Sequence, residues 1–144
     1  MSFLLEAGRN PIVQLVVIAI VVDTVFGVLR AIKERKFNSN FGINGAIRKC
    51  GMIITIMALA CVDRVVAVNL IGFIPEAART YLPVQHVGTM EFFGILFIAY
   101  EVTSILKNMT LCGLPVKTIW IRVKSVLGKY TDELPPDGPQ CGGA

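Results

Sequence analysis

Three carboxylates of this sequence stand inside long apolar stretches, where an ionised group is costly. Asp23, Asp63 and Glu101 each interrupt a run of apolar residues. An ionised side chain at the centre of a bilayer costs about 2.5–3.5 kcal/mol on insertion scales. The sequence offers no set of nucleophile, base and orienting group, and no phosphate-binding loop. The chemistry that these carboxylates indicate is therefore pairing, contact between subunits or ion passage, and we expect no enzyme.

Small and polar side chains share helical faces with these carboxylates. Two small residues follow Asp23 at four and eight positions, a spacing that permits close approach of a second helix. Two polar residues lie about one and two turns after Glu101. The basic residue after Asp63 can snorkel outward or pair with a carboxylate of another helix, and Asp23 lies at a similar depth. The candidate residues for oligomer contacts or for lining a pore are Asp23, Gly27, Ala31, Asp63, Arg64, Glu101, Ser104 and Asn108.

Two interpretations of these intramembrane groups stay open. In the first, the groups pair with one another inside a helical bundle or between copies of the chain. In the second, they line a water-filled path. Because three carboxylates at staggered depths are hard to satisfy within one three-helix chain, we favour packing between copies over direct pore lining.

Three apolar blocks must position these groups. Hydrophobic residues make up 54% of the chain and charged residues 17%, and the mean hydropathy is +0.67, whereas soluble domains carry about 25% charged residues. Each block has about 20 residues, which at a rise of about 1.5 Å spans a hydrocarbon core of about 30 Å. No block shows the polar stripe of a soluble helix. We expect an all-α integral membrane protein with transmembrane helices at about 11–32, 50–73 and 87–106.

A basic amphipathic helix is predicted after the third span, at about 115–130. Gly113 is typical of a helix end and Pro115 of a helix start. Apolar residues around Trp120 recur at helical spacing, and basic residues take the other face. The apolar face either lies in the membrane interface, with the indole among the headgroups, or packs on neighbouring subunits; we favour the first.

The connecting segments complete the expected organisation. Residues 37–45 are rich in Ser, Asn and Gly, so we expect a turn, with Asn44 as the cap of the second span. Residues 131–144 are rich in Pro and Gly and should form a flexible tail. The chain therefore divides into one membrane domain, 1–130, and this tail.

Basic residues predict the orientation. They gather in the first connection and after the third span, whereas the second connection has only Arg79. Since basic loops stay in the cytoplasm, we expect the N-terminus outside and the C-terminus in the cytoplasm. The net charge of +4 then faces anionic lipid, and no nucleic-acid motif accompanies it. The residues expected at the cytoplasmic membrane surface are Lys33, Arg35, Lys36, Arg48, Lys49, Trp120, Arg122, Lys124 and Lys129.

The cysteines show no sign of a metal or redox centre. Cys50, Cys61, Cys112 and Cys141 have no paired spacing of the kind that zinc sites require. We expect no metal and no other cofactor.

Three blocks of the sequence resemble the toxin secretion/phage lysis holin family. Residues 23–39 resemble its pattern of an Asp, a Gly four positions later, a small residue after a basic one, and then a basic run and a Ser. Residues 45–49 resemble the segment that precedes its second span. Residues 101–108, followed by 113–115, resemble its third block. The resemblance covers about residues 10–130.

This resemblance implies a protein of the bacterial cytoplasmic membrane that forms large oligomers and opens lesions at a set time. Its partners are then other copies of itself, the lipid bilayer, and an endolysin or toxin that passes without a need for direct binding. Two alternatives remain. A small oligomeric ion channel or transporter subunit would give a discrete, selective conductance. A membrane adaptor that regulates a separate holin would bind partners without killing the cell.

Overall fold

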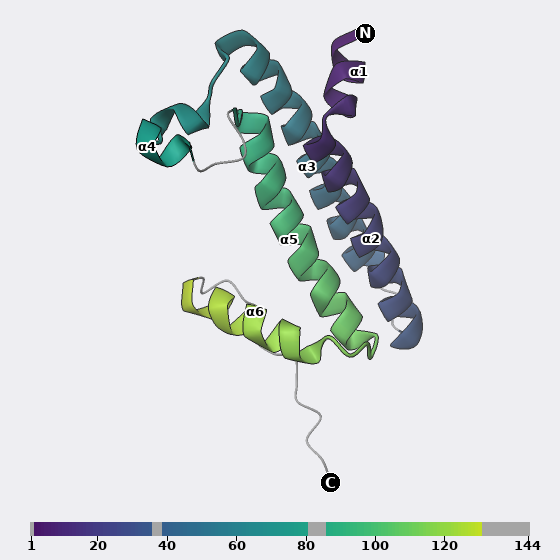
Figure 1. The fold of residues 1–144 in the computed structure, drawn as a ribbon. Coiled ribbons are helices and arrows are strands. Elements are labelled where there is room, and N and C mark those ends of the chain that lie inside the picture. Colours follow the sequence, from purple (N-terminus) through teal and green to yellow (C-terminus); the bar gives the residue numbers. More distant parts are fainter. Residues whose placement is uncertain (1, 36–38, 81–85, 131–144) are drawn as a thin grey trace.

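The computed structural model describes residues 2–35, 39–80 and 86–130, and all regular structure in these ranges is helical. Three long helices lie side by side (Figure 1). The elements are α1 (Ser2–Arg9), α2 (Pro11–Lys33), α3 (Ser39–Val66), the 3-10 helix η1 (Leu70–Phe73), α4 (Glu76–Arg79), α5 (Thr89–Leu111) and α6 (Lys117–Tyr130). The expected all-α fold is confirmed.

Three of these helices are long and apolar enough to cross a membrane. The candidate spans are Pro11–Lys33, Gly42–Val66 and Thr89–Leu111, with mean hydropathies of 2.6, 1.7 and 1.5. A helix of 23 residues is about 34 Å long, which matches a hydrocarbon core. The chain is thus an integral membrane protein with three transmembrane helices.

The bundle has two ends that differ in what surrounds them. At the end where α2 and α5 begin lie α1 and α4, and we call this the α4 end (Figure 1). At the opposite end α2 and α5 finish, and α6 runs sideways across the direction of the spans; we call this the α6 end (Figure 1). The short helix α1 was not expected from the sequence.

The second helix starts and ends earlier than the apolar block of 50–73 suggested. Residues 39–45 are helical, and Asn44 lies within α3 instead of capping it. A helix that the apolar block has nucleated gains one backbone hydrogen bond per added residue, which offsets the poor propensity of Gly and Asn. At the other end Ala67 takes a left-handed conformation (φ 49°) that stops α3. Asn69 then caps η1 by accepting a hydrogen bond from the Ile71 amide (3.1 Å).

Local capping signals in the sequence set the ends of α2 and α5. Asn10 caps α2 by accepting from the Ile12 amide (2.9 Å), with Pro11 at the first helical position. Gly113 (φ 89°) ends α5, where the Leu114 amide donates to the Met109 carbonyl (3.1 Å). This is the left-handed glycine termination that the sequence predicts, and α6 follows it. The predicted tail, 131–144, lies outside the described residues.

The apolar core lies toward the α4 end and joins all three spans. Its buried members recur every three or four residues, so each helix offers one face to the others. They are Ala7, Val13, Val16, Ile20, Met52, Ile56, Ala60 and Met90. α2 packs most extensively on α5, whereas α3 packs on α5 and more lightly on α2. A side chain at Gly94 of α5 would collide with Ile12, so the glycine permits the close approach of α5 and α2.

The outer surface of the bundle is apolar. Large apolar side chains on all three spans are exposed, among them Val21 (55%), Ile54 (68%) and Leu96 (48%). In a soluble protein such a surface would drive association. Around three helices of membrane-spanning length, it is the surface that lipid chains cover.

Candidate functional site

A charged pair lies within the membrane-spanning part of the bundle. The carboxylate of Asp23 on α2 is 2.9 Å from the ammonium of Lys49 on α3. Both side chains are largely buried, with exposed fractions of 6% and 14%. Since α2 and α3 run antiparallel, the second half of α2 lies at the depth of the first half of α3. A buried pair of this kind offsets the cost of holding either charge alone in a poorly solvated site.

The ammonium of Lys49 uses its remaining hydrogens on α2 as well. It donates to the Thr24 hydroxyl (2.6 Å) and to the Ile20 carbonyl (3.4 Å). The Thr24 hydroxyl in turn donates to the same carbonyl (2.6 Å). Lys49 was expected at the cytoplasmic membrane surface; it points into the bundle instead, because Asp23 and two oxygens of α2 take its three hydrogens.

Polar groups of α5 complete the surroundings of Asp23. The Asn108 amide donates to the second carboxylate oxygen (3.0 Å), and Ser104 lies partly buried one turn before Asn108 on the same helix. A Cβ at Gly27 would lie 3.8 Å from the Asn108 amide nitrogen, so the small face of α2 meets α5 here. Ala31 is partly buried further along α2. We call Asp23, Lys49, Glu101, Ser104 and Asn108 the charged cluster.

Glu101 is the member of the charged cluster without a partner. It is 0% exposed, and neither carboxyl oxygen has a hydrogen-bond partner in the described part of the chain. The carboxylate of Asp23, on the neighbouring helix α2, is one of the charged groups near it. The nearby Arg48 is exposed, and its guanidinium lies over the Tyr100 ring, 5.0 Å from the centroid.

Asp63 belongs to a separate polar network at the α4 end. Its carboxylate accepts hydrogen bonds from the Thr89 amide (2.9 Å) and the Met90 amide (2.7 Å), and so caps α5. Glu91 accepts from the Gly88 amide and from the Asn10 side chain, both at 2.9 Å. A Cβ at position 88 would lie 2.6 Å from an Asp63 oxygen, so any other residue here would displace the capping carboxylate.

We expected the three carboxylates to be hard to satisfy within one chain, and the structure satisfies two of them there. Asp23 and Asp63 both find their partners inside the same molecule. Arg64 does not approach Asp23; its guanidinium is 3.0 Å from Glu6 of α1, at the exposed α4 end. Among the three carboxylates, only Glu101 lacks a partner in the described residues.

Most residues expected at the membrane surface lie at the α6 end. The Lys33 ammonium donates to the Leu111 carbonyl (3.2 Å), and Arg35 is exposed just after α2. Three of these residues, Trp120, Arg122 and Lys124, lie on α6. Lys36 and the side chain of Lys129 lie outside the described part of the structure.

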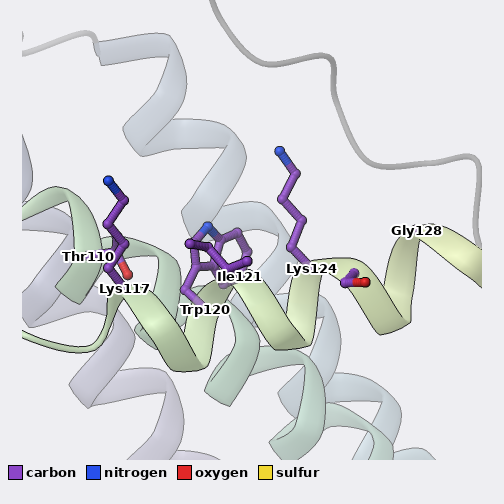
Figure 2. A pocket seen from close by; sticks show the side chains of 7 residues that line it. Thr110, Lys117, Trp120, Ile121, Lys124 and Gly128 are labelled. Atoms are coloured by element: carbon purple, nitrogen blue, oxygen red, sulfur yellow. The ribbon is translucent and has the colours of Figure 1, made fainter.

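An open groove of about 620 Å³ lies where α5 meets α6. Figure 2 shows Lys117 and Lys124 extending to the same side of α6, with Trp120 and Ile121 between them. The lining residues are Thr110, Lys117, Trp120, Ile121, Lys124, Ser125 and Gly128. Two ammonium groups and two hydroxyl groups beside a mainly apolar wall that includes an indole are typical of a helix at the membrane interface.

Sequence reasoning missed the partner of Asp23 and the role of Asp63. Lys49 directly precedes the expected second span, so we interpreted it as a residue at the membrane surface. Thr24 and Asn10 gave no signal by themselves, because their partners are set by the register of antiparallel helices. No cluster of three or more metal-binding side chains occurs among the residues that the structure describes.

An apolar exterior around three spans, with charges paired inside, defines a small multi-pass membrane protein. The sequence pattern of the bacteriophage holin family matches residues 2–129, so the chain belongs to that family and is a holin-like membrane protein. It is similar to the holin-like protein TcdE of Clostridioides difficile, with 47% identity over 134 residues, which are 92% of this chain and 79% of the relative. No solved structure matches the chain.

Proposed function

We propose that the chain accumulates in the cytoplasmic membrane of a bacterium, assembles with copies of itself, and opens lesions that release an endolysin or a toxin. The observation that carries this proposal is the match to the holin family over residues 2–129, which includes all three spans and nearly all of α6. The relative named a holin-like protein supports the same function.

The surface of one chain explains why several copies are needed. Lipid-facing side chains of the spans are mainly apolar, and the charged cluster is buried. A single closed bundle therefore offers a protein no polar route through the hydrocarbon core. A lesion wide enough for a folded enzyme needs many copies of the chain around its edge. The surfaces of these copies that face the water in the lesion must be polar.

The orientation in this proposal places the α6 end in the cytoplasm. Basic residues of the first connection and of α6 gather at that end, which fits the excess of Lys and Arg in cytoplasmic segments. Single cysteines in a chain whose native cysteines are replaced by serine test it. A membrane-impermeant maleimide should label Gly72→Cys in intact cells and Thr118→Cys only after permeabilisation. The reverse pattern would overturn the orientation.

The groove between α5 and α6 is, in this arrangement, a contact with the inner leaflet. Its two lysines can bind headgroup phosphates while the indole of Trp120 lies at headgroup level. Arg122 and Lys129 add positive charge on the same helix. The preferred position of α6 is therefore on the membrane and not between subunits.

Controlled expression with an endolysin that lacks its own export signal tests the function. We expect growth to continue at first, followed by abrupt lysis and loss of the membrane potential. A toxin fused to a reporter without an export signal, expressed without an endolysin, distinguishes toxin release from endolysin release. Continued growth with an intact potential and no release of either cargo would refute the proposal.

Substitution of Asp23 with Asn separates two roles of the charged cluster, in forming the passage and in packing the subunits. If oligomers persist but the membrane stays intact, the charged cluster takes part in forming the passage. If the oligomers disappear, the cluster serves packing. Glu76→Gln on the exposed helix α4 is the matched control, because it removes one carboxylate far from the charged cluster.

An ion channel or transporter subunit is the second candidate. The observation in its favour is the charged cluster itself, since ionisable groups inside a membrane bundle commonly mark ion pathways. Planar bilayer recordings separate the two functions. A discrete, ion-selective conductance with the endolysin retained in the cell would favour the channel. No conductance and no lethality would favour an adaptor that regulates another holin.

A further inference from the structure

Glu101 occupies a site where an ionised carboxylate has no compensation. It is fully buried, and both carboxyl oxygens lack a hydrogen-bond partner in the described part of the chain. An unpaired buried charge costs far more than a buried neutral group, and a protein commonly avoids that cost by changing the protonation state. The question is therefore which group neutralises Glu101.

The charged and polar groups around Glu101 come from all three spans and are already engaged. On α3, Lys49 is bound to Asp23 and to two oxygens of α2. Arg48, on the same helix, is exposed and lies over Tyr100. On α5, Asn108 donates to Asp23. No described donor therefore reaches the carboxyl oxygens of Glu101.

The charge balance of the site leads to the same conclusion. Asp23 and Lys49 cancel one another as a buried ion pair. An ionised Glu101 would leave one net negative charge beside the carboxylate of Asp23, between helices that lipid surrounds. Two carboxylates in one poorly solvated site repel each other, and such pairs retain a proton between them.

We propose that Glu101 carries a proton and donates it in a hydrogen bond to Asp23, so that the charged cluster is a proton-binding site. Asp23 stays ionised and accepts from Glu101, Lys49 and Asn108, which its two oxygens can accommodate. The cluster is then neutral overall. Release of the proton adds a negative charge between α2 and α5 and weakens their contact, so the closed bundle is the proton-bound state.

Infrared spectroscopy tests the protonation directly and does not depend on the proposed function. The chain is made by cell-free synthesis with ¹³C-carboxyl glutamate and reconstituted in liposomes at neutral pH. We expect a label-sensitive C=O stretch of a protonated carboxyl group, which is absent in Glu101→Gln and retained in Glu76→Gln. If the labelled wild-type chain shows only carboxylate bands at neutral pH, the proposal is wrong, whether or not the variants fold.

The pH dependence of stability is a second, independent measurement. The folded chain holds one more proton than the unfolded chain above the pH at which a free glutamate ionises. Its folding equilibrium constant should therefore fall about tenfold per pH unit in that range, until the bundle also releases the proton. SDS unfolding in mixed micelles should show this slope in the wild type and in Glu76→Gln, but not in Glu101→Gln. An equal slope in Glu101→Gln would overturn the proposal.

Discussion

Replacing Lys49 with Met separates the charged pair while keeping the length of the side chain. The substitution removes the ammonium from Asp23, from the Thr24 hydroxyl and from the Ile20 carbonyl. The side chain of Asp23 is only 6% exposed, so water cannot replace the lost partner without local opening. Its hydrogen bond from Asn108 remains. In the variant, the carboxylate of Asp23 stays buried and keeps its hydrogen bond from Asn108, but it loses the positive charge that neutralised it.

The size of the effect follows from the burial of both groups. Removing one partner of a buried ion pair costs about 3–5 kcal/mol. Because the Lys49 side chain keeps 14% of its surface exposed, we expect the lower part of this range. A loss of about 3 kcal/mol reduces the folding equilibrium constant roughly 100-fold, at about 1.4 kcal/mol per factor of ten. Asp23→Asn combined with Lys49→Met should recover most of this loss, since neither charge is then left alone.

SDS unfolding in mixed micelles, followed by circular dichroism, measures these differences. Lys33→Met is the matched control, because it removes an exposed ammonium that makes one hydrogen bond, to the Leu111 carbonyl. We expect it to cost about 1 kcal/mol or less. The reasoning fails if Lys49→Met is no more harmful than Lys33→Met, or if the double variant is as unstable as the sum of its single variants.

Three further predictions concern packing, capping and the lipid contact. Gly94→Ala places a methyl group against Ile12 and should cost about 1–3 kcal/mol in the same titration; a shortened side chain at position 12 should restore part of it. Asp63→Asn should cost about 1 kcal/mol and speed hydrogen exchange in the first turn of α5, whose amides it caps. Lys117→Gln and Lys124→Gln should each raise about fivefold the fraction of anionic lipid needed to shift the emission of the single tryptophan, at about 1 kcal/mol per lysine. An unchanged lipid requirement would contradict the headgroup contact.

The three spans were predictable because hydropathy is a local property of the sequence. An apolar run long enough to cross a bilayer must form a helix, since its backbone groups find no other partners there. The end of α5 was predictable for a similar reason. Gly113 takes a left-handed conformation that other residues rarely adopt, so the signal lies in the residue itself.

The partners inside the bundle were not predictable, because they depend on the register between helices. Lys49 lies 26 residues after Asp23 and Asn108 lies 85 residues after it, yet both contact its carboxylate. No periodicity within one helix fixes how far it slides along the next. A lysine before an apolar block is also typical of a membrane border, so the local pattern favoured the surface position.

The cap of α5 shows the same limitation at the α4 end. Asp63 directly precedes Arg64 in the sequence. From this pair we expected partners on another helix or on another copy of the chain. The actual partners are the amides of Thr89 and Met90, which begin the next span. The sequence alone gave no sign of this contact, in which Gly88 leaves the space that the carboxylate fills.

These pairings change the reason why copies of the chain should associate. Asp23 and Asp63 are satisfied within one molecule, so unpaired intramembrane charge does not by itself drive assembly. Under the proposed function, we expect copies to meet through apolar faces while the bundle is closed, in a step that is insensitive to the charged cluster. A polar passage then requires the cluster to become exposed, which requires α3 to separate from α2. Because α3 packs only lightly on α2, the Lys49–Asp23 pair is a main link between these two helices. The double variant without that pair should therefore assemble normally but open earlier, whereas a purely structural cluster would leave the time of opening unchanged.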